Sequence, residues 1–363
     1  AAGCSEKSPS SSDSASSPNS TSSPDSTSSP DSTPGDGSTA TTVAPTECVA
    51  ESVVECAPEG TTFPDLLPPE PIVADGTPIR IGMINTDTGP TNAFPELTAA
   101  TRAGVEWINS ELGGVDGLPL EVFPCDAKMS ATGSRACGQQ MVEDEVVAVL
   151  GGIDIFDDSV QVLEDNQIPL VGGVPVGFAT VNSPISFTFS GGAWGGDLAL
   201  AYHITEILHA ERVSILYSDF GPITDAAFWA KEAILRSGVA EGDVNMVPMP
   251  IIAEDILTPM TAANESNPDA MIVLVTGAGC SGAFQAAIDI EVEAQLYFSG
   301  GCLDPSITAD GLDRIEGYIF NIENVLEGSP PDVALYTSVL EMYAPNVEAA
   351  SAGELNPLET VPL

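Results

Sequence analysis

Short apolar runs alternate with amphipathic stretches along residues 79–321. The run IRIGMIN at residues 79–85 is β-branched and almost wholly apolar, which is typical of a strand buried on both faces. Residues 96–112 then place apolar side chains three or four positions apart, which predicts an amphipathic helix. The glycines of GGVDG suit its left-handed end. With LPLEVFPC as a second strand, this order predicts a right-handed parallel unit.

The same rhythm continues in two sets. The first adds the strands VVAVLGG, IPLVGG and ISFTFSGG, with helices at residues 135–143 and 157–166. The second alternates helices with the strands RVSILYSD, VNMVPMP, AMIVLVTG and QLYFSGG, and ends with a strand at 317–321. The chain therefore predicts an α/β fold of two lobes, residues 76–192 and 193–321, each a parallel sheet flanked by helices, with a cleft between them. We expect residues 322–363 to begin a return to the first lobe and to leave it incomplete.

The first part of the chain has a different character. Its hexapeptide repeat of Ser, Thr, Pro and Asp has no apolar side chains to bury, which predicts an extended, disordered tether over residues 5–75. Ala1, Ala2, Gly3 and Cys4 match the end of a bacterial lipoprotein signal, whose cysteine is lipidated after cleavage. We expect the rest of that signal to precede residue 1. The chain is then expected on the outer face of the cell membrane, held there through the Cys4 lipid only.

Charge narrows the possible partners. The 363 residues carry 53 acids and 9 bases, a net charge of -44. Such a balance argues against nucleic-acid binding, which needs Lys and Arg for phosphates, and against an anionic membrane surface. The apolar content of 43% is enough for the cores of two lobes.

Cysteine usage points to an oxidising compartment. Lipidation of Cys4 would leave six of the 7 cysteines, an even number suited to disulfides. Six cysteines allow 15 pairings, so the connectivity stays open. Proximity along the chain favours Cys48–Cys56, Cys125–Cys137 and Cys280–Cys302.

One motif in the chain could indicate an enzyme. Residues 277–282 read GAGCSG after a strand and before a helix, which is the context of a dinucleotide fingerprint. The next strand, however, lacks the acid that would hold a ribose, and Cys280 is better explained as a partner of Cys302. Both histidines, His203 and His209, fall within one helical stretch, and no Cys-x-x-Cys spacing occurs. We therefore predict a tight turn, no cofactor, no metal site and no catalytic residues.

The opening unit resembles a known family. The pattern G-x-x-x-x-x-T-G-P starting at Gly82, the aromatic Phe94, and W-I-N-x-x-x-G-G-x-x-G-x-P-L starting at Trp107 are similar to the leucine/isoleucine/valine-binding proteins. These are type I periplasmic binding receptors of branched-chain amino acid-type ABC transporters. The resemblance covers about residues 79–321. It implies the two-lobed type I periplasmic binding fold, capture of a small-molecule ligand rather than catalysis, and ABC permease subunits as partners.

Parallel sheets carry ligands in the loops at their carboxyl ends. These loops combine aromatic and acidic side chains in the proportion that small-ligand pockets use. In the first lobe the candidate ligand contacts are Phe94, Asp154, Ile155, Phe156, Val174 and Pro175; beyond it they are Trp194, Tyr217, Asp219, Phe220, Gly279 and Cys302.

The resemblance is incomplete at the ligand anchors. Phe94 matches the aromatic that family members place over the ligand. The loop that usually holds the ligand carboxylate through a Ser reads Gly-Ile-Asp-Ile-Phe-Asp here. Asp154 would repel a carboxylate and favour a cation or an amide. The Glu expected for the ligand ammonium falls on Gly301 or Cys302.

We therefore expect a small amino-acid-like, amide or polar ligand rather than leucine. A surface sensor that uses the same clamp to report to a partner is the alternative function. A nucleotide-dependent enzyme is a weaker one.

Overall fold

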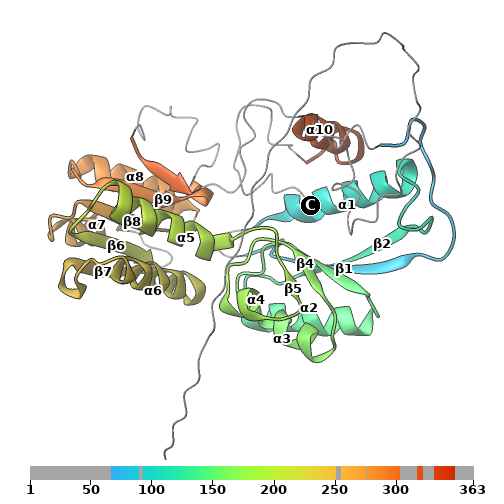
Figure 1. Cartoon of the computed structure of the whole chain (residues 1–363), viewed down its shortest axis with the longest axis horizontal. Coiled ribbons are helices and arrows are strands. Elements are labelled where there is room, and N and C mark those ends of the chain that lie inside the picture. The colour runs from blue at the N-terminus through green and yellow to red at the C-terminus, as the bar shows by residue number, and fades with distance from the viewer. Residues whose placement is uncertain are drawn as a thin grey trace, which may run out of the picture. The chain divides into compact units, whose positions relative to one another are not determined.

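The computed structural model describes residues 67–89, 93–250, 255–275, 277–302, 317–321 and 331–347. Cys4, most of the predicted tether and the predicted pair Cys48–Cys56 lie outside these residues. The described residues form two parallel five-stranded sheets, which confirms the predicted fold class (Figure 1).

The first sheet has the strand order β2-β1-β3-β4-β5. Its strands are β1 (Ile79–Asn85), β2 (Leu120–Asp126), β3 (Ala148–Gly151), β4 (Leu170–Gly172) and β5 (Ser186–Phe187). The helices between them are α1 (Pro95–Glu111), α2 (Ala131–Glu143), α3 (Asp158–Asp165) and α4 (Phe178–Asn182). Helices α2 and α3 cover one face of this sheet, and α1 lies on the other (Figure 1). Buried side chains of α2 and α3 belong to one apolar cluster, and Leu97 of α1 belongs to another. Burial on both faces is the reason that residues 81–84 of β1 form an apolar run.

The second sheet has the order β10-β9-β8-β6-β7. Its strands are β6 (Val213–Ser218), β7 (Val244–Met249), β8 (Ala270–Leu274), β9 (Gln295–Ser299) and β10 (Ile319–Asn321). Its helices are α5 (Gly192–Tyr202), which continues as a π-helical turn (His203–Ile207), α6 (Gly221–Arg236), α7 (Leu257–Asn264) and α8 (Ala278–Asp289). Helices α7 and α8 pack on one face and α5 and α6 on the other. Short 3-10 turns lie at Glu241–Asp243 and Gly300–Cys302.

Caps and prolines set where helices begin, and α2 begins before the predicted residue 135. Helix α2 begins at Ala131, because the Ser130 hydroxyl accepts a hydrogen bond from the Gly133 amide at 3.1 Å and caps it. Helix α6 begins at Gly221 with a proline in its first turn, where the missing amide proton costs nothing. Polar caps and prolines fix these starts, whereas apolar spacing reports only the buried face.

The last described helix, α10 (Pro331–Tyr343), packs on α1. Leu340 joins Ala100 and Ala103 in one small apolar cluster. The Tyr343 hydroxyl donates to the Glu111 carboxylate at 2.6 Å and lies 2.9 Å from the Ser110 hydroxyl. The chain therefore returns from the second lobe to the first.

Two of the predicted disulfides are confirmed. Cys125–Cys137 joins the end of β2 to α2, and Cys280–Cys302 joins the first turn of α8 to the turn after β9. In both bridges the Cα atoms are 5.4 Å apart. Each bridge therefore fastens a carboxyl strand end to a neighbouring element.

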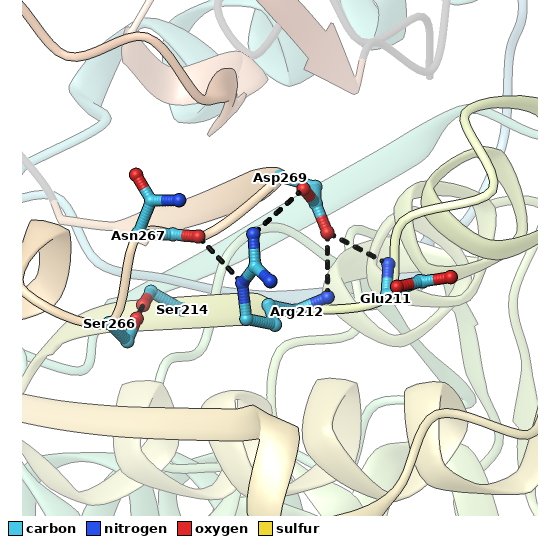
Figure 2. A network of polar contacts seen from close by, with 6 residues as sticks. All are labelled: Glu211, Arg212, Ser214, Ser266, Asn267 and Asp269. Carbon is cyan, nitrogen blue, oxygen red and sulfur yellow. Dashed lines mark hydrogen bonds and ion pairs between the residues drawn. The ribbon is translucent and has the colours of Figure 1, made fainter.

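A polar network lies at the amino ends of β6 and β8 in the second sheet (Figure 2). The Asp269 carboxylate accepts hydrogen bonds from the backbone amides of Arg212, at 2.9 Å, and Glu211, at 3.0 Å. The Arg212 side chain donates to the Asn267 carbonyl at 2.8 Å. The amide of Arg212 is the main reason that the pKa of Asp269 is lowered. This network supports the amino ends of β6 and β8, away from the loops expected to bind a ligand.

Among the described helices, none combines the length and the apolar character needed to cross a membrane.

Candidate ligand site

One buried amide joins two of the predicted ligand loops. Asn85 ends β1 and has no exposed surface. Its Oδ1 accepts a hydrogen bond from the Ile153 amide at 2.9 Å, and its Nδ2 donates to the Phe94 carbonyl at 2.7 Å. The same Nδ2 donates to Asp87 at 2.7 Å. Asn85 was not among the predicted site residues, although a polar residue that ends an apolar strand is a usable signal.

A carboxylate at the end of β2 holds the same loop from the other side. Asp126 accepts hydrogen bonds from the backbone amides of Asp87, Thr88 and Lys128 at 3.0, 3.1 and 2.8 Å. Burial alone would raise the pKa of Asp126, but the Thr88 hydroxyl and these amides outweigh it and lower the pKa. Asp126 therefore stays ionised as a fixed acceptor for the loop after β1.

Apolar members of the predicted site come together. Phe94, Ile155, Phe156, Val174 and Phe220 belong to one cluster, which also contains Met83, Leu97, Met129 and Ile153. The rings of Phe156 and Phe220 meet edge to face with centroids 5.3 Å apart. Phe156 follows β3 in the first lobe, and Phe220 follows β6 in the second. Residues from both lobes thus contribute to one apolar cluster of buried and partly buried side chains, which we name the aromatic cluster.

The carboxyl of Asp154 is engaged by two serine hydroxyls. Its Oδ2 accepts hydrogen bonds from the hydroxyls of Ser134, at 2.6 Å, and Ser159, at 2.7 Å. Its Oδ1 is buried and has no hydrogen-bond partner. Burial raises the pKa of Asp154, and the two serine hydroxyls offset only part of that rise.

A second acid stands close to the first. Burial, followed by the charge of Asp154, raises the pKa of Asp157 to about 6, against the opposing effect of a hydrogen bond from the Thr180 amide. That amide donates to Asp157 Oδ2 at 2.9 Å. Two acids therefore share a poorly solvated place at the amino end of α3.

A small cavity opens beside Asp154. Its volume is about 20 Å³, room for about one water molecule. Its lining includes Asp154, Ser159, Thr180, Val174 and Pro175. The glycines that end β3 and β4 complete the wall. Gly173 has φ +78, and a Cβ there would lie 2.9 Å from the Gly151 Cα. The close approach of the loops after β3 and β4 therefore requires glycine at position 173.

Trp194, which was expected to close over a ligand, contacts residues of both lobes. Its indole N–H donates to the Val176 carbonyl at 3.0 Å. Its ring lies between Phe178, with centroids 5.5 Å apart, and Trp229, at 4.8 Å. The ring therefore bridges α4 of the first lobe and α6 of the second, and its one polar atom is already engaged.

The remaining candidates follow strands of the second sheet. Tyr217 is nearly buried, and burial together with Asp219 raises its pKa. Asp219 accepts a hydrogen bond from the Thr224 hydroxyl at 3.1 Å and directly precedes Phe220. Gly279 lies in the first turn of α8. Cys302 is fully buried and bonded to Cys280.

The residues that could have formed a metal site or a nucleotide-binding turn are found as follows in the described part of the chain. No group of three or more His, Cys, Asp or Glu side chains there could hold a metal ion. His203 pairs with the Tyr297 hydroxyl at 2.9 Å, and His209 lies 3.2 Å from the Thr205 carbonyl. Gly277 precedes α8 at φ 54, a conformation that suits glycine. Both histidines and this turn are accounted for by packing.

Comparison with known proteins gives one family. A family model described as periplasmic binding protein matches residues 78–353. No curated protein matches the chain. The fold recurs in solved structures that are only distantly related in sequence.

Three of these structures show the range. A leucine-binding protein from Thermotoga maritima has 16% identity and a TM-score of 0.62, over 77% of this chain and 78% of that chain. A branched-chain amino acid transporter substrate-binding protein from Streptococcus pneumoniae, in complex with isoleucine, has 17% identity and a TM-score of 0.60, over 74% and 78%. An ABC transporter solute-binding protein from R. palustris, in complex with 4-hydroxybenzoate, has 20% identity and a TM-score of 0.60, over 78% and 77%. At such identities the likeness is one of fold.

Proposed function

The chain belongs to the periplasmic binding protein family, and from that premise we propose that it captures a small amino-acid-like, amide or polar ligand for an ABC importer. The ligand is held between the two lobes, and the closed form delivers it to the permease subunits. Hinge closure around a ligand is established for this architecture. The mechanism is binding and release, without a chemical step.

The aromatic cluster is the observation that supports this proposal. It draws Phe94, Phe156 and Val174 from three strand-end loops of the first lobe and Phe220 from the second. Carboxyl ends of parallel strands are where this class of sheet binds ligands. A surface shared by two lobes can be completed by their closure, so ligand binding and closure become one event.

The loops, rather than the fold, decide the ligand. Similar structures hold ligands as different as isoleucine and 4-hydroxybenzoate. In this chain the loop after β3 offers the buried acids Asp154 and Asp157, which disfavour a carboxylate at that point. A cationic or amide group of the ligand fits this loop better.

The placement of the protein is part of the proposal. Lipidation of Cys4 would hold the chain on the outer face of the cell membrane, and the Ser-, Thr- and Pro-rich tether would let the lobes reach the permease. Mass spectrometry of protein purified from membranes tests this directly. A diacylglyceryl modification on Cys4 is expected, and an unmodified Cys4 in mature protein would contradict the anchor.

The ligand function is tested on the full chain purified without denaturant. We expect a small molecule to co-purify and to be identified by mass spectrometry. Rebinding should raise the melting temperature and compact the protein in small-angle scattering. Phe156→Ala should weaken binding at least tenfold, because it removes a ring of the aromatic cluster. Phe189→Ala is the matched control, since that ring is 81% exposed. Equal affinity of both variants would contradict the proposed site.

A further inference from the structure

The first turn of α5 is held by both lobes. Farther along the helix, its side chains lie in an apolar cluster of the second lobe. At its start, the Ala193 amide donates to the Pro175 carbonyl at 3.1 Å. The Trp194 indole N–H donates to the Val176 carbonyl at 3.0 Å. Gly192 permits this approach, because it has φ +56 and a Cβ there would collide with the Pro175 carbonyl oxygen. A helix of the second lobe is therefore hydrogen-bonded to the loop after β4 of the first.

The loop after β4 is also part of the aromatic cluster. Val174 is a buried member of that cluster, and Val176 packs against it. The Val174 amide donates to the Gly152 carbonyl at 3.1 Å, which ties this loop to the end of β3. Residues 174–176 thus contact the cluster through two valine side chains and α5 through two carbonyls. A shift of these valines therefore moves or breaks the hydrogen bonds to α5.

The ring of Trp194 contacts one aromatic ring from each lobe. Phe178 belongs to α4 of the first lobe and Trp229 to α6 of the second. The Trp229 Nε1 is buried and has no hydrogen-bond partner among the described residues. Ring contacts tolerate several arrangements, whereas a hydrogen bond weakens steeply when its angle is lost. The bond from Trp194 to the Val176 carbonyl is therefore the directional contact of this stack.

We propose that Trp194 is a positioning residue that transmits changes in the aromatic cluster to the second lobe. The inference rests on the proposed function and adds the residue through which ligand capture reaches the angle between the lobes. A ligand that displaces Val174 or Val176 moves the loop after β4. The Val176 carbonyl then moves the indole, and α5 carries the second lobe with it. This role does not require the indole to touch the ligand.

Hydrogen exchange with mass spectrometry on the full chain, dialysed to remove small molecules, tests the transmission. The reporter is a peptide covering residues 190–196, because the Ala193 amide is bonded to the loop after β4. Phe156→Ala opens the aromatic cluster and should accelerate exchange of the reporter by about threefold or more. Phe123→Ala is the matched control, since it removes a ring of the same lobe that packs on a different apolar cluster. Equal effects of the two variants on the reporter would overturn the proposal.

A double-mutant cycle assigns the transmission to the indole N–H. Trp194→Phe keeps a ring in the stack and removes the hydrogen bond to Val176, whereas Trp229→Phe removes an N–H that has no partner. In Trp229→Phe, the effect of Phe156→Ala on the reporter should be the same as in the natural chain. In Trp194→Phe, the reporter should already exchange about fivefold faster, as expected for one lost hydrogen bond, and Phe156→Ala should add nothing.

The cycle separates transmission from a purely structural role. If Trp194 only stabilised the fold, its effect and that of Phe156→Ala would be additive, and additivity overturns the proposal. Should Trp194→Phe not fold, the comparison of Phe156→Ala with Phe123→Ala in the natural chain decides alone.

The two proposals fail differently. Additive effects in a chain that co-purifies with a small molecule overturn the role of Trp194 and leave the capture function standing. A non-additive cycle in a chain that retains no small molecule supports the role of Trp194 and contradicts the capture function.

Discussion

Asn85→Ala should loosen the loops of the first lobe more than any other single truncation at the site. The substitution removes the acceptor of the Ile153 amide and the donor to the Phe94 carbonyl. It also removes the donor to Asp87, at 2.7 Å, and a longer contact to Thr98, at 3.3 Å. The loops after β1 and β3 would then share no side-chain link through β1.

The expected cost follows from the burial of each partner. The Ile153 amide is in a buried hydrogen bond, so leaving it without an acceptor costs about 1–3 kcal/mol. The Phe94 carbonyl and the Asp87 carboxylate belong to partly buried bonds, and rehydration should limit their loss to about 0.5–1 kcal/mol each. Together these give about 3 kcal/mol, which corresponds to an opening equilibrium about 100-fold more favourable.

Hydrogen exchange with mass spectrometry measures this locally. Peptides covering residues 85–94 and 148–157 should exchange about 100-fold faster in Asn85→Ala, whereas β6 of the second lobe should be unchanged. Asn109→Ala is the matched control, because it removes two hydrogen bonds to Leu120, of 2.7 and 2.8 Å, at the other end of β2. The account is refuted if residues 148–157 exchange at the natural rate, or if Asn109→Ala accelerates them equally.

Three further predictions concern stability. Replacing both Cys280 and Cys302 by Ala removes a disulfide that joins residues with a sequence separation of 22. The free energy of unfolding, measured in urea titrations, should fall by about 3 kcal/mol. Burial raises the pKa of Asp197 to about 8, so the native state keeps the proton of this carboxyl to higher pH than the unfolded state does. The free energy of unfolding should therefore fall as the pH rises from about 4 to 8. In urea titrations at pH 5 to 8, Asp197→Asn should flatten that fall. Trp194→Phe loses a hydrogen bond worth about 1 kcal/mol, whereas Trp229→Phe loses none; calorimetry should therefore show the lower melting temperature for Trp194→Phe, and the reverse order would contradict the bridging role.

Periodicity was enough to predict the lobes, because it reports burial directly. A strand covered on both faces must be mostly apolar, and β1 and β8 are recognisable on that ground. The disulfide Cys280–Cys302 was predictable for a related reason. Neighbouring parallel strands end at the same edge of a sheet, so cysteines after β8 and β9 are brought close.

Side-chain direction within the loops was not predictable in the same way. Asp154 and Trp194 stay predicted ligand contacts, but the sequence did not indicate their partners within the protein. Asp154 Oδ2 is held by Ser134 from α2, 20 positions away in sequence. The Trp194 indole donates to the Val176 carbonyl of the first lobe. Such pairings depend on how elements distant in sequence pack, which neither spacing nor composition encodes.

The position of Asp154 connects packing to stability. A buried acceptor without a donor destabilises the loop after β3, and Asp157 adds a like charge beside it. The hydroxyls of Ser134 and Ser159 both donate to Asp154 Oδ2, so the same carboxyl fastens α2 to α3. An apolar residue at position 154 would avoid the cost of the unpaired Oδ1, but it would leave both hydroxyls without this acceptor.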